Sequence, residues 1–118
     1  MTTPSQPHLP PSGELAPGQA FALAGQVEYV TGSVVSRTLV KKATGTITLF
    51  AFDAGQGLSE HQAPFDAFVQ IVDGAATLRI GGKDVRARAG DIVVMPANVP
   101  HAVQADEPLK MLLVMIRS

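Results

Sequence analysis

Residues 67–95 read AFVQIVDGAATLRIGGKDVRARAGDIVVM, a series of short apolar runs separated by turns that contain glycine. Two of the turns are Asp73-Gly74 and Gly81-Gly82. Asp-Gly and Gly-Gly readily adopt the positive φ angles of tight hairpins, so both turns predict hairpins. Residues 83–89 alternate polar and apolar side chains, which is typical of a strand with one solvated face. The stretch therefore predicts consecutive short β-strands.

The same pattern continues on both sides of this stretch. Short runs rich in Val, Ile, Leu, Thr and Phe occupy residues 33–41, 46–53 and 110–116, again with glycine turns between them. No window shows a capped helical period, and we expect at most one short turn of helix, within residues 14–24. Short strands at this spacing are typical of a sandwich or barrel. At 118 residues the chain has room for one core, so we predict a single all-β domain.

Two of the expected strands, at residues 46–52 and 111–116, are apolar at nearly every position. A strand that is apolar on both faces must be covered on both. In a domain of this size one face packs against the core, and we expect the other to pack against a second copy of the chain. The sequence thus predicts a homodimer.

The first 18 residues contain more than half of the nine prolines. This composition predicts an extended, poorly ordered leader, followed by a domain over residues 19–118. The leader has neither the basic nor the apolar region of a signal peptide, and the longest apolar run, residues 111–116, is too short to cross a bilayer. We therefore expect a soluble protein without a membrane partner.

Cysteine and charge content exclude several classes of function. The chain has no cysteine, which excludes disulfides, thiolate metal sites and cysteine nucleophiles, and which suits a reducing compartment. We expect a cytoplasmic location. Nine basic against ten acidic side chains give a net charge of −1, and no dense run of Lys or Arg is present to neutralise phosphates. Nucleic acid is therefore not an expected partner.

A first spaced pattern of residues begins at Gly55. Five residues separate Gly55 from His61, and Ala63 stands two positions after His61. Ala67 follows after three further residues, and six more lead to Gly74.

A second spaced pattern begins at Gly90. Five residues separate it from Pro96, which is followed at short intervals by Asn98, His101 and Ala105. Asparagine is the best non-glycine residue for a left-handed turn position, which we expect for Asn98.

Together these patterns resemble the two motifs of the cupin family. The first family motif is Gly-x5-His-x-His-x3–4-Glu-x6-Gly, and here every spacing is met while Ala63 and Ala67 stand at the second His and at the Glu. The second is Gly-x5-Pro-x-Gly-x2-His-x3-Asn, with Asn98 here in place of the second glycine and Ala105 in place of the final Asn.

The resemblance implies a double-stranded β-helix, which is a jelly-roll barrel with a cleft at one end. Within the family the chain is most similar to the small single-domain conserved-barrel group, the cupin 2 type, whose members mostly have no assigned function. Cupins often form dimers. In members with a complete site, three His and one Glu hold a divalent metal, typically iron, manganese, zinc, nickel or copper.

His61 and His101 are the ligand positions that this chain retains, and they are the candidate residues for a divalent metal. Such a site needs at least three protein donors. In a regular strand Ser59 would share the cleft-facing side with His61, whereas Glu60 and Asp66 would face outward. The pocket predicted from these considerations is formed by Ser59, His61, Ala63, Ala67, Val69, Ile71, His101 and Val103.

Two functions follow for this cleft, and the sequence identifies no catalytic residue. The first is the binding of a small, mostly apolar molecule with one polar group facing the histidines. The second is a metal-dependent enzyme of oxygenase or isomerase type, with a two-histidine site completed by water or substrate. A vestigial site is the third interpretation. We interpret Met95, Met111 and Met115 as core or dimer packing residues.

Overall fold

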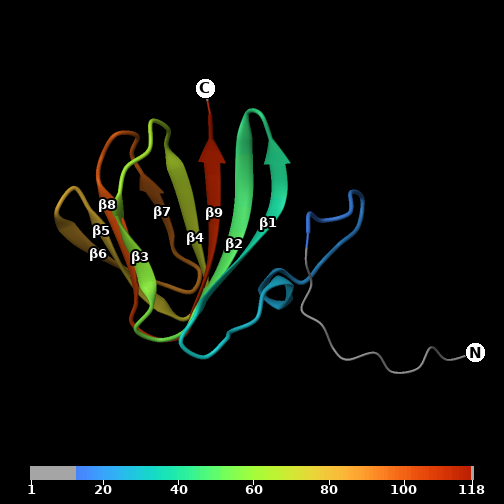
Figure 1. Cartoon of the computed structure of the whole chain (residues 1–118), viewed down its shortest axis with the longest axis horizontal. Coiled ribbons are helices and arrows are strands. Elements are labelled where there is room, and N and C mark those ends of the chain that lie inside the picture. Colours follow the sequence, from blue (N-terminus) through green and yellow to red (C-terminus); the bar gives the residue numbers. More distant parts are fainter. Residues whose placement is uncertain (1–12, 118) are drawn as a thin grey trace, which may run out of the picture.

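The computed structural model describes residues 13–117, which form two facing β-sheets (Figure 1). A five-stranded sheet has the order β1-β2-β9-β4-β7 and a four-stranded sheet the order β3-β8-β5-β6, with every neighbouring pair antiparallel. The all-β barrel predicted from the sequence is confirmed. The strands are β1 (Val34–Lys42), β2 (Gly45–Phe52), β3 (Gly57–His61), β4 (Ala67–Asp73), β5 (Ala75–Ile80), β6 (Lys83–Arg88), β7 (Ile92–Met95), β8 (His101–Ala105) and β9 (Leu109–Ile116).

One short 3-10 turn, η1 (Leu23–Gln26), precedes the strands and overlaps the end of the expected helical turn. No helix within residues 13–117 is long and apolar enough to cross a membrane.

The structure contains one of the two hairpins predicted from the sequence. Gly81 and Gly82 both have positive φ and join β5 to β6 as a two-residue hairpin, as predicted. The hairpin predicted at Gly74 is wrong, because β4 belongs to the five-stranded sheet and β5 to the four-stranded sheet. A Cβ atom at Gly74, where φ is 80°, would lie 1.9 Å from the carbonyl oxygen of Pro108. Glycine is required there because the chain passes closely over another backbone segment as it crosses between sheets.

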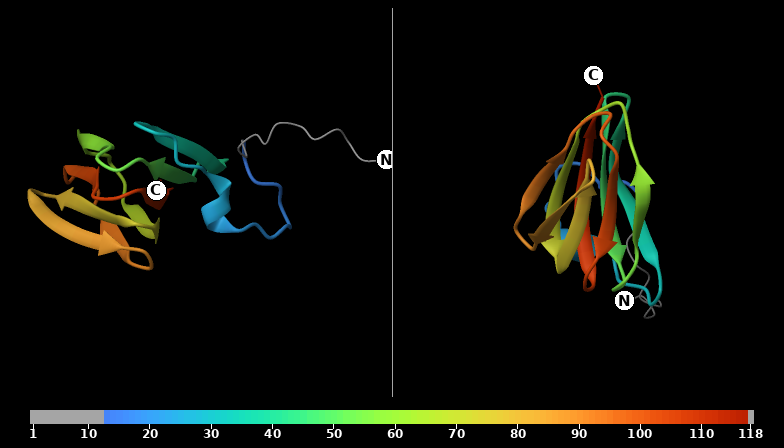
Figure 2. Two further views of the ribbon diagram at one scale, coloured as in Figure 1. Left: turned by 90° about the horizontal axis from the view of Figure 1, so that it is seen from below. Right: turned by 90° about the vertical axis from the view of Figure 1, so that its left-hand side faces the viewer.

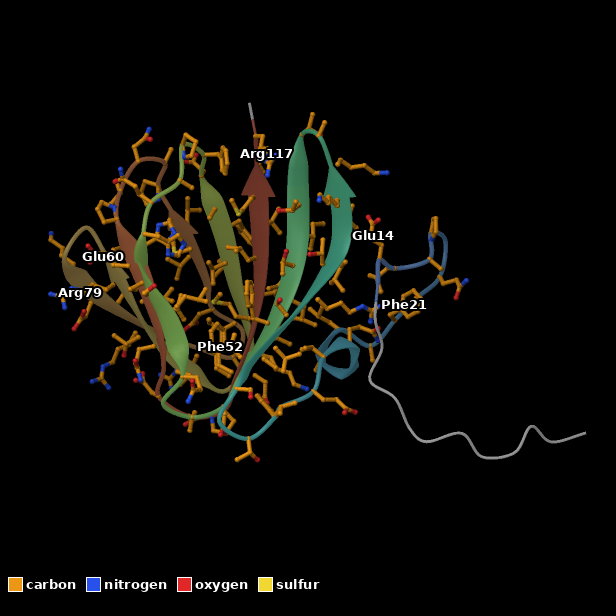
Figure 3. All side chains as sticks on the ribbon, viewed as in Figure 1. Glu14, Phe21, Phe52, Glu60, Arg79 and Arg117 are labelled. Atoms are coloured by element: carbon orange, nitrogen blue, oxygen red, sulfur yellow. The ribbon has the colours of Figure 1, made fainter. Side chains whose placement is uncertain are left out.

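The core lies between the sheets and is filled from both of them. Phe52, Val69 and Ile71 of the five-stranded sheet pack with Leu78 and other fully buried side chains of the four-stranded sheet. Each such side chain stabilises the fold by about 1.5–3 kcal/mol through removal of apolar surface from water. Figure 3 shows Phe52 near the end of the barrel opposite Arg117.

The outer face of β1 and β2 is covered by the chain's own N-terminal segment, residues 13–33 (Figure 2). Val27 packs there with Leu39, Leu49 and Ala51 in a second buried cluster. We expected a second copy of the chain to cover this face, and the structure shows that part of it is covered internally.

Residues 13–18, which belong to the predicted leader, take part in this covering. The Leu15 N–H donates to the carbonyl oxygen of Leu39 at 2.9 Å, and the Lys41 N–H donates to the Glu14 carboxylate at 2.8 Å. Residues 1–12 of the predicted leader lie outside the described residues.

Candidate functional site

The ends of five strands meet at one end of the barrel, the end that carries the C-terminus in Figure 1. His61 is the last residue of β3 and Met95 the last of β7, whereas Ala67 begins β4 and His101 begins β8. Met115 is the next-to-last residue of β9. Side chains that are far apart in the sequence are therefore brought together here.

An irregularity in β3 decides which side chains face inward. Leu58 pairs with Val103 and His61 pairs with His101, so β3 has one residue more than β8 between the two pairs. Such a bulge reverses the alternation of side chains. As a result Leu58 and His61 both line the interior, and Ser59 is exposed and does not. Our expectation for Ser59 assumed a regular strand and was wrong for this reason.

The loops that carry the two histidines are tied together by hydrogen bonds. The Asn98 N–H donates to the carbonyl oxygen of Ala63 at 2.7 Å, and the Ala97 N–H donates to Oδ1 of Asp66 at 2.9 Å. Asn98 has a φ of 61° and is the one non-glycine residue with positive φ among residues 13–117, which confirms the predicted left-handed turn. These bonds fix the β7–β8 loop, and with it His101, against the β3–β4 loop.

Each of the two imidazole rings is held by a hydrogen bond to a backbone carbonyl, and the rings meet edge to face. Nδ1–H of His61 donates to the Ser59 carbonyl oxygen at 2.7 Å, and Nδ1–H of His101 donates to the Val99 carbonyl oxygen at 3.2 Å. The Nε2 atoms of the two rings are 3.1 Å apart, and the ring planes meet at 72°. His61 is exposed, whereas His101 is buried with 4% of its surface accessible.

The number of protons on the two imidazole rings limits which of these hydrogen bonds can form at the same time. A carbonyl oxygen only accepts, so each of the two Nδ1 contacts needs an N–H, and a neutral pair of imidazoles has only these two. The two Nε2 atoms, 3.1 Å apart, then each carry a lone pair and no proton. The contact between the two Nε2 atoms is favourable only when a cation, either an extra proton or a metal ion, lies between them.

Burial lowers the pKa of His101, and the neighbouring His61 acts in the same direction, while the hydrogen bond to Val99 opposes the shift. Loss of water penalises the charged imidazolium. His101 therefore favours the neutral form, in which its Nε2 atom presents a lone pair to the cavity.

A cavity of about 60 Å³ lies beneath the histidine pair. Five of the residues predicted to form the pocket line it, namely His61, Ala63, Ala67, His101 and Val103. Val69 and Ile71 do not line it, because they lie further along β4 and are completely buried in the core. The remaining lining residues are Leu58, Met95, Met111, Leu113 and Met115.

Met95, Met111 and Met115, which the sequence predicts to be core or dimer packing residues, all line this cavity. Ala67 pairs with Met95 on one side and with Met115 on the other, so the two thioethers flank the position where the cupin motif has Glu. Their position beside Ala67 follows from the pairing of β4 with β7 and β9, which cannot be read from the sequence of any one strand.

The side chains present do not fit the divalent metal that the resemblance implies. No three side chains of His, Asp or Glu come together as a metal site anywhere in residues 13–117. Glu60 is exposed on β3, and Asp66 is exposed and accepts a hydrogen bond from the Ala97 N–H. Two imidazoles without a carboxylate leave a divalent ion short of donors and of compensating charge.

The chain is similar to known proteins in both sequence and fold. The family model described as "Cupin domain" matches residues 48–115. A conserved protein of unknown function from Streptococcus pyogenes is 34% identical, with 92% of this chain and 95% of that chain covered and a TM-score of 0.85. A cupin 2 conserved barrel domain protein from Leptotrichia buccalis is 42% identical, with 82% of this chain and 47% of that chain covered and a TM-score of 0.80.

A cupin superfamily protein from Desulfitobacterium hafniense is 25% identical, with 88% of this chain and 95% of that chain covered and a TM-score of 0.83. No curated protein matches the sequence. Because the family model covers more than half of the residues and the fold and motif positions agree with it, the chain belongs to the cupin family, as a small conserved-barrel member.

Proposed function

We propose that this cupin binds a small ligand in the cavity between the two sheets, with His61 and His101 as the polar contacts. The observation that carries the proposal is the pair of Nε2 atoms, 3.1 Å apart at an otherwise apolar cavity. Their lone pairs require a positively charged or proton-donating partner. A bound ligand with such a group supplies it.

The volume of the cavity limits the size of the ligand that it can hold. About 60 Å³ is several times the roughly 10–15 Å³ that one water needs. It is far below the roughly 300–1,000 Å³ of sites that enclose drug-sized molecules. The part of the ligand inside the barrel is therefore compact, and any larger part extends past the exposed His61 into solvent.

The alternative function is a divalent-metal-dependent enzyme of oxygenase or isomerase type. It requires substrate or water to complete the coordination, because the described residues supply only two imidazole nitrogens and no carboxylate. The apolar wall formed by Leu58, Leu113 and the methionines favours ligand binding over this alternative.

A thermal-shift screen tests the proposal. Compact organic acids, alcohols and metal ions are each added to the wild-type protein and to a His61→Ala/His101→Ala double variant. A ligand present at 100 times its Kd stabilises the folded state by about 2.7 kcal/mol, which is readily seen in the melting temperature. We expect at least one compound or ion to raise the wild-type value and not that of the variant. A screen in which no shift depends on the histidines contradicts the proposal.

The homodimer expected from the sequence is also part of this proposal, and an exposed apolar row on the five-stranded sheet supports it. On the outer face of the five-stranded sheet Ile47 pairs with Val114, Val114 with Phe68, and Phe68 with Val94. Val94 and Ile92 are 56% and 62% exposed. This apolar row continues beyond the part covered by residues 13–33, and a second copy packed on β4, β7 and β9 would remove it from water.

A further inference from the structure

We infer that the ligand of this cavity is monovalent copper, Cu(I), held by Nε2 of His61 and His101 and by the thioether sulfur of Met95 or Met115. The inference rests on the proposed function, since it names the ligand of the same site. It replaces the divalent metal, which the side chains present do not fit.

The donors are placed by strand pairing. Met95 and Met115 are the direct partners of Ala67 on its two sides, and all three line the cavity together with both histidines. Directly opposite residues in antiparallel strands have Cβ atoms about 4.5–5.5 Å apart, so the thioethers flank the small Ala67 side chain. Met is unbranched and adaptable, so its sulfur can reach into space that the alanine leaves.

The histidine geometry suits a bound metal ion. With metal–nitrogen bonds of about 2.0 Å, nitrogens 3.1 Å apart subtend an angle of about 100° at the ion, close to tetrahedral. Both rings are already oriented by their Nδ1–H bonds to backbone carbonyls, which is the usual support for a ligating histidine. The remaining coordination positions then face the cavity and its sulfur atoms.

The neutral charge of the donors and the softness of the thioether sulfur favour Cu(I) over a divalent ion. Imidazole and thioether are neutral donors, and no carboxylate among the described residues joins them. The cost of burying an ion without a counter-charge rises with the square of its charge, which disfavours a divalent ion. Thioether is a soft ligand, and soft ligands select Cu(I) over the divalent metals that prefer oxygen.

The competing explanation is that the methionines only fill the volume left by Ala63 and Ala67. Leucine has nearly the same volume as methionine and no sulfur, so Met→Leu substitutions separate the two explanations.

The experiment is an anaerobic titration of the purified full-length chain with Cu(I) against a colorimetric Cu(I) chelator. The variants are Met95→Leu/Met115→Leu and His61→Ala/His101→Ala. We expect about one Cu(I) per wild-type chain. Loss of an outer-shell partner already weakens metal binding about 10–100-fold, so loss of the ligating sulfur should weaken Cu(I) binding at least ~10-fold. X-ray absorption should show sulfur bound to copper in the wild type and not in Met95→Leu/Met115→Leu.

Two results overturn the inference: no Cu(I) bound by the wild type, or equal affinity and no sulfur signal in wild type and Met95→Leu/Met115→Leu. The thermal-shift screen keeps the two proposals apart. If an organic compound binds through the histidines and Cu(I) does not, the copper inference is wrong and the proposed function stands. If neither binds, both are wrong.

Discussion

The Nε2 atoms of His61 and His101 face each other at 3.1 Å, and each ring donates its Nδ1–H to the carbonyl oxygen of the residue two positions earlier. The two histidines come from β3 and β8, which are neighbours in the four-stranded sheet, and the bulge in β3 brings them into register. The same local hydrogen bond favours the proton on Nδ1 in both rings, which leaves a lone pair on each Nε2 atom.

The tautomer of His101 is the first prediction. At pH 7.5 in the ligand-free protein we expect its proton on Nδ1 and not on Nε2, because the Val99 carbonyl accepts from Nδ1 and burial disfavours the charged ring. Nitrogen NMR of the histidine side chains distinguishes the two tautomers. A proton on Nε2 would contradict the lone-pair arrangement.

The two histidines should differ in their effect on stability. His61→Ala should change the free energy of unfolding by no more than about 0.5 kcal/mol, as for other exposed residues. His101→Ala should cost about 1–3 kcal/mol, because it removes a buried side chain and its hydrogen bond to Val99. Urea denaturation of both variants checks this. Equal losses would mean that His61 is also a structural residue.

Tyr29 gives the fold a predicted pH dependence. Its hydroxyl donates to Asp73 Oδ2 at 2.5 Å, and burial, followed by this hydrogen bond and the Asp73 charge, raises the pKa of Tyr29. A phenol with a raised pKa holds its proton more tightly in the folded state, so its contribution is present below about pH 10, the unfolded value, and is lost as the pH rises further.

The test is Tyr29→Phe, followed by urea denaturation between pH 8 and pH 11. At pH 8 the variant should be about 0.5–1.5 kcal/mol less stable, the value of one hydrogen bond. Above pH 10 its stability should fall less steeply than that of the wild type. Tyr29 is the one tyrosine of the chain, so no other phenol contributes. Parallel curves would contradict the prediction.

The proposed dimer is tested by placing a charge on the exposed apolar row. Val94→Lys should convert a dimer to a monomer in light scattering, because a buried lysine on the sheet face loses its hydration. Gln104→Lys adds the same charge at an exposed position of β8, in the other sheet, and should leave the dimer intact. A wild-type monomer at micromolar concentration, or no effect of Val94→Lys on a dimer, would exclude this interface.

Features that depend on neighbouring residues in the sequence could be predicted from it. The β5–β6 hairpin follows from Gly81-Gly82, and the left-handed turn at Asn98 follows from the position of that residue in the motif. Both are set by backbone preferences within a few residues.

Features that depend on strand pairing could not be predicted. The bulge that turns Leu58 inward and Ser59 outward is a property of β3 against β8, and alternation within β3 alone gives the opposite result. The contacts of Ala67 with Met95 and Met115 likewise depend on which strands become neighbours. The chemical character of the cavity therefore emerges only from the assembled sheet.

Binding in the cavity can be observed directly through its methionines. Three of the four methionines of the chain line it, so the methyl signals of protein labelled with carbon-13 methionine report on this site. In a titration with Cu(I) and with each compact compound that raises the melting temperature, we predict saturable shifts of Met95 and Met115 that are absent in His61→Ala/His101→Ala. Methyl signals that stay unchanged in the wild type, or that shift equally in the double variant, would contradict a ligand site at the histidine pair.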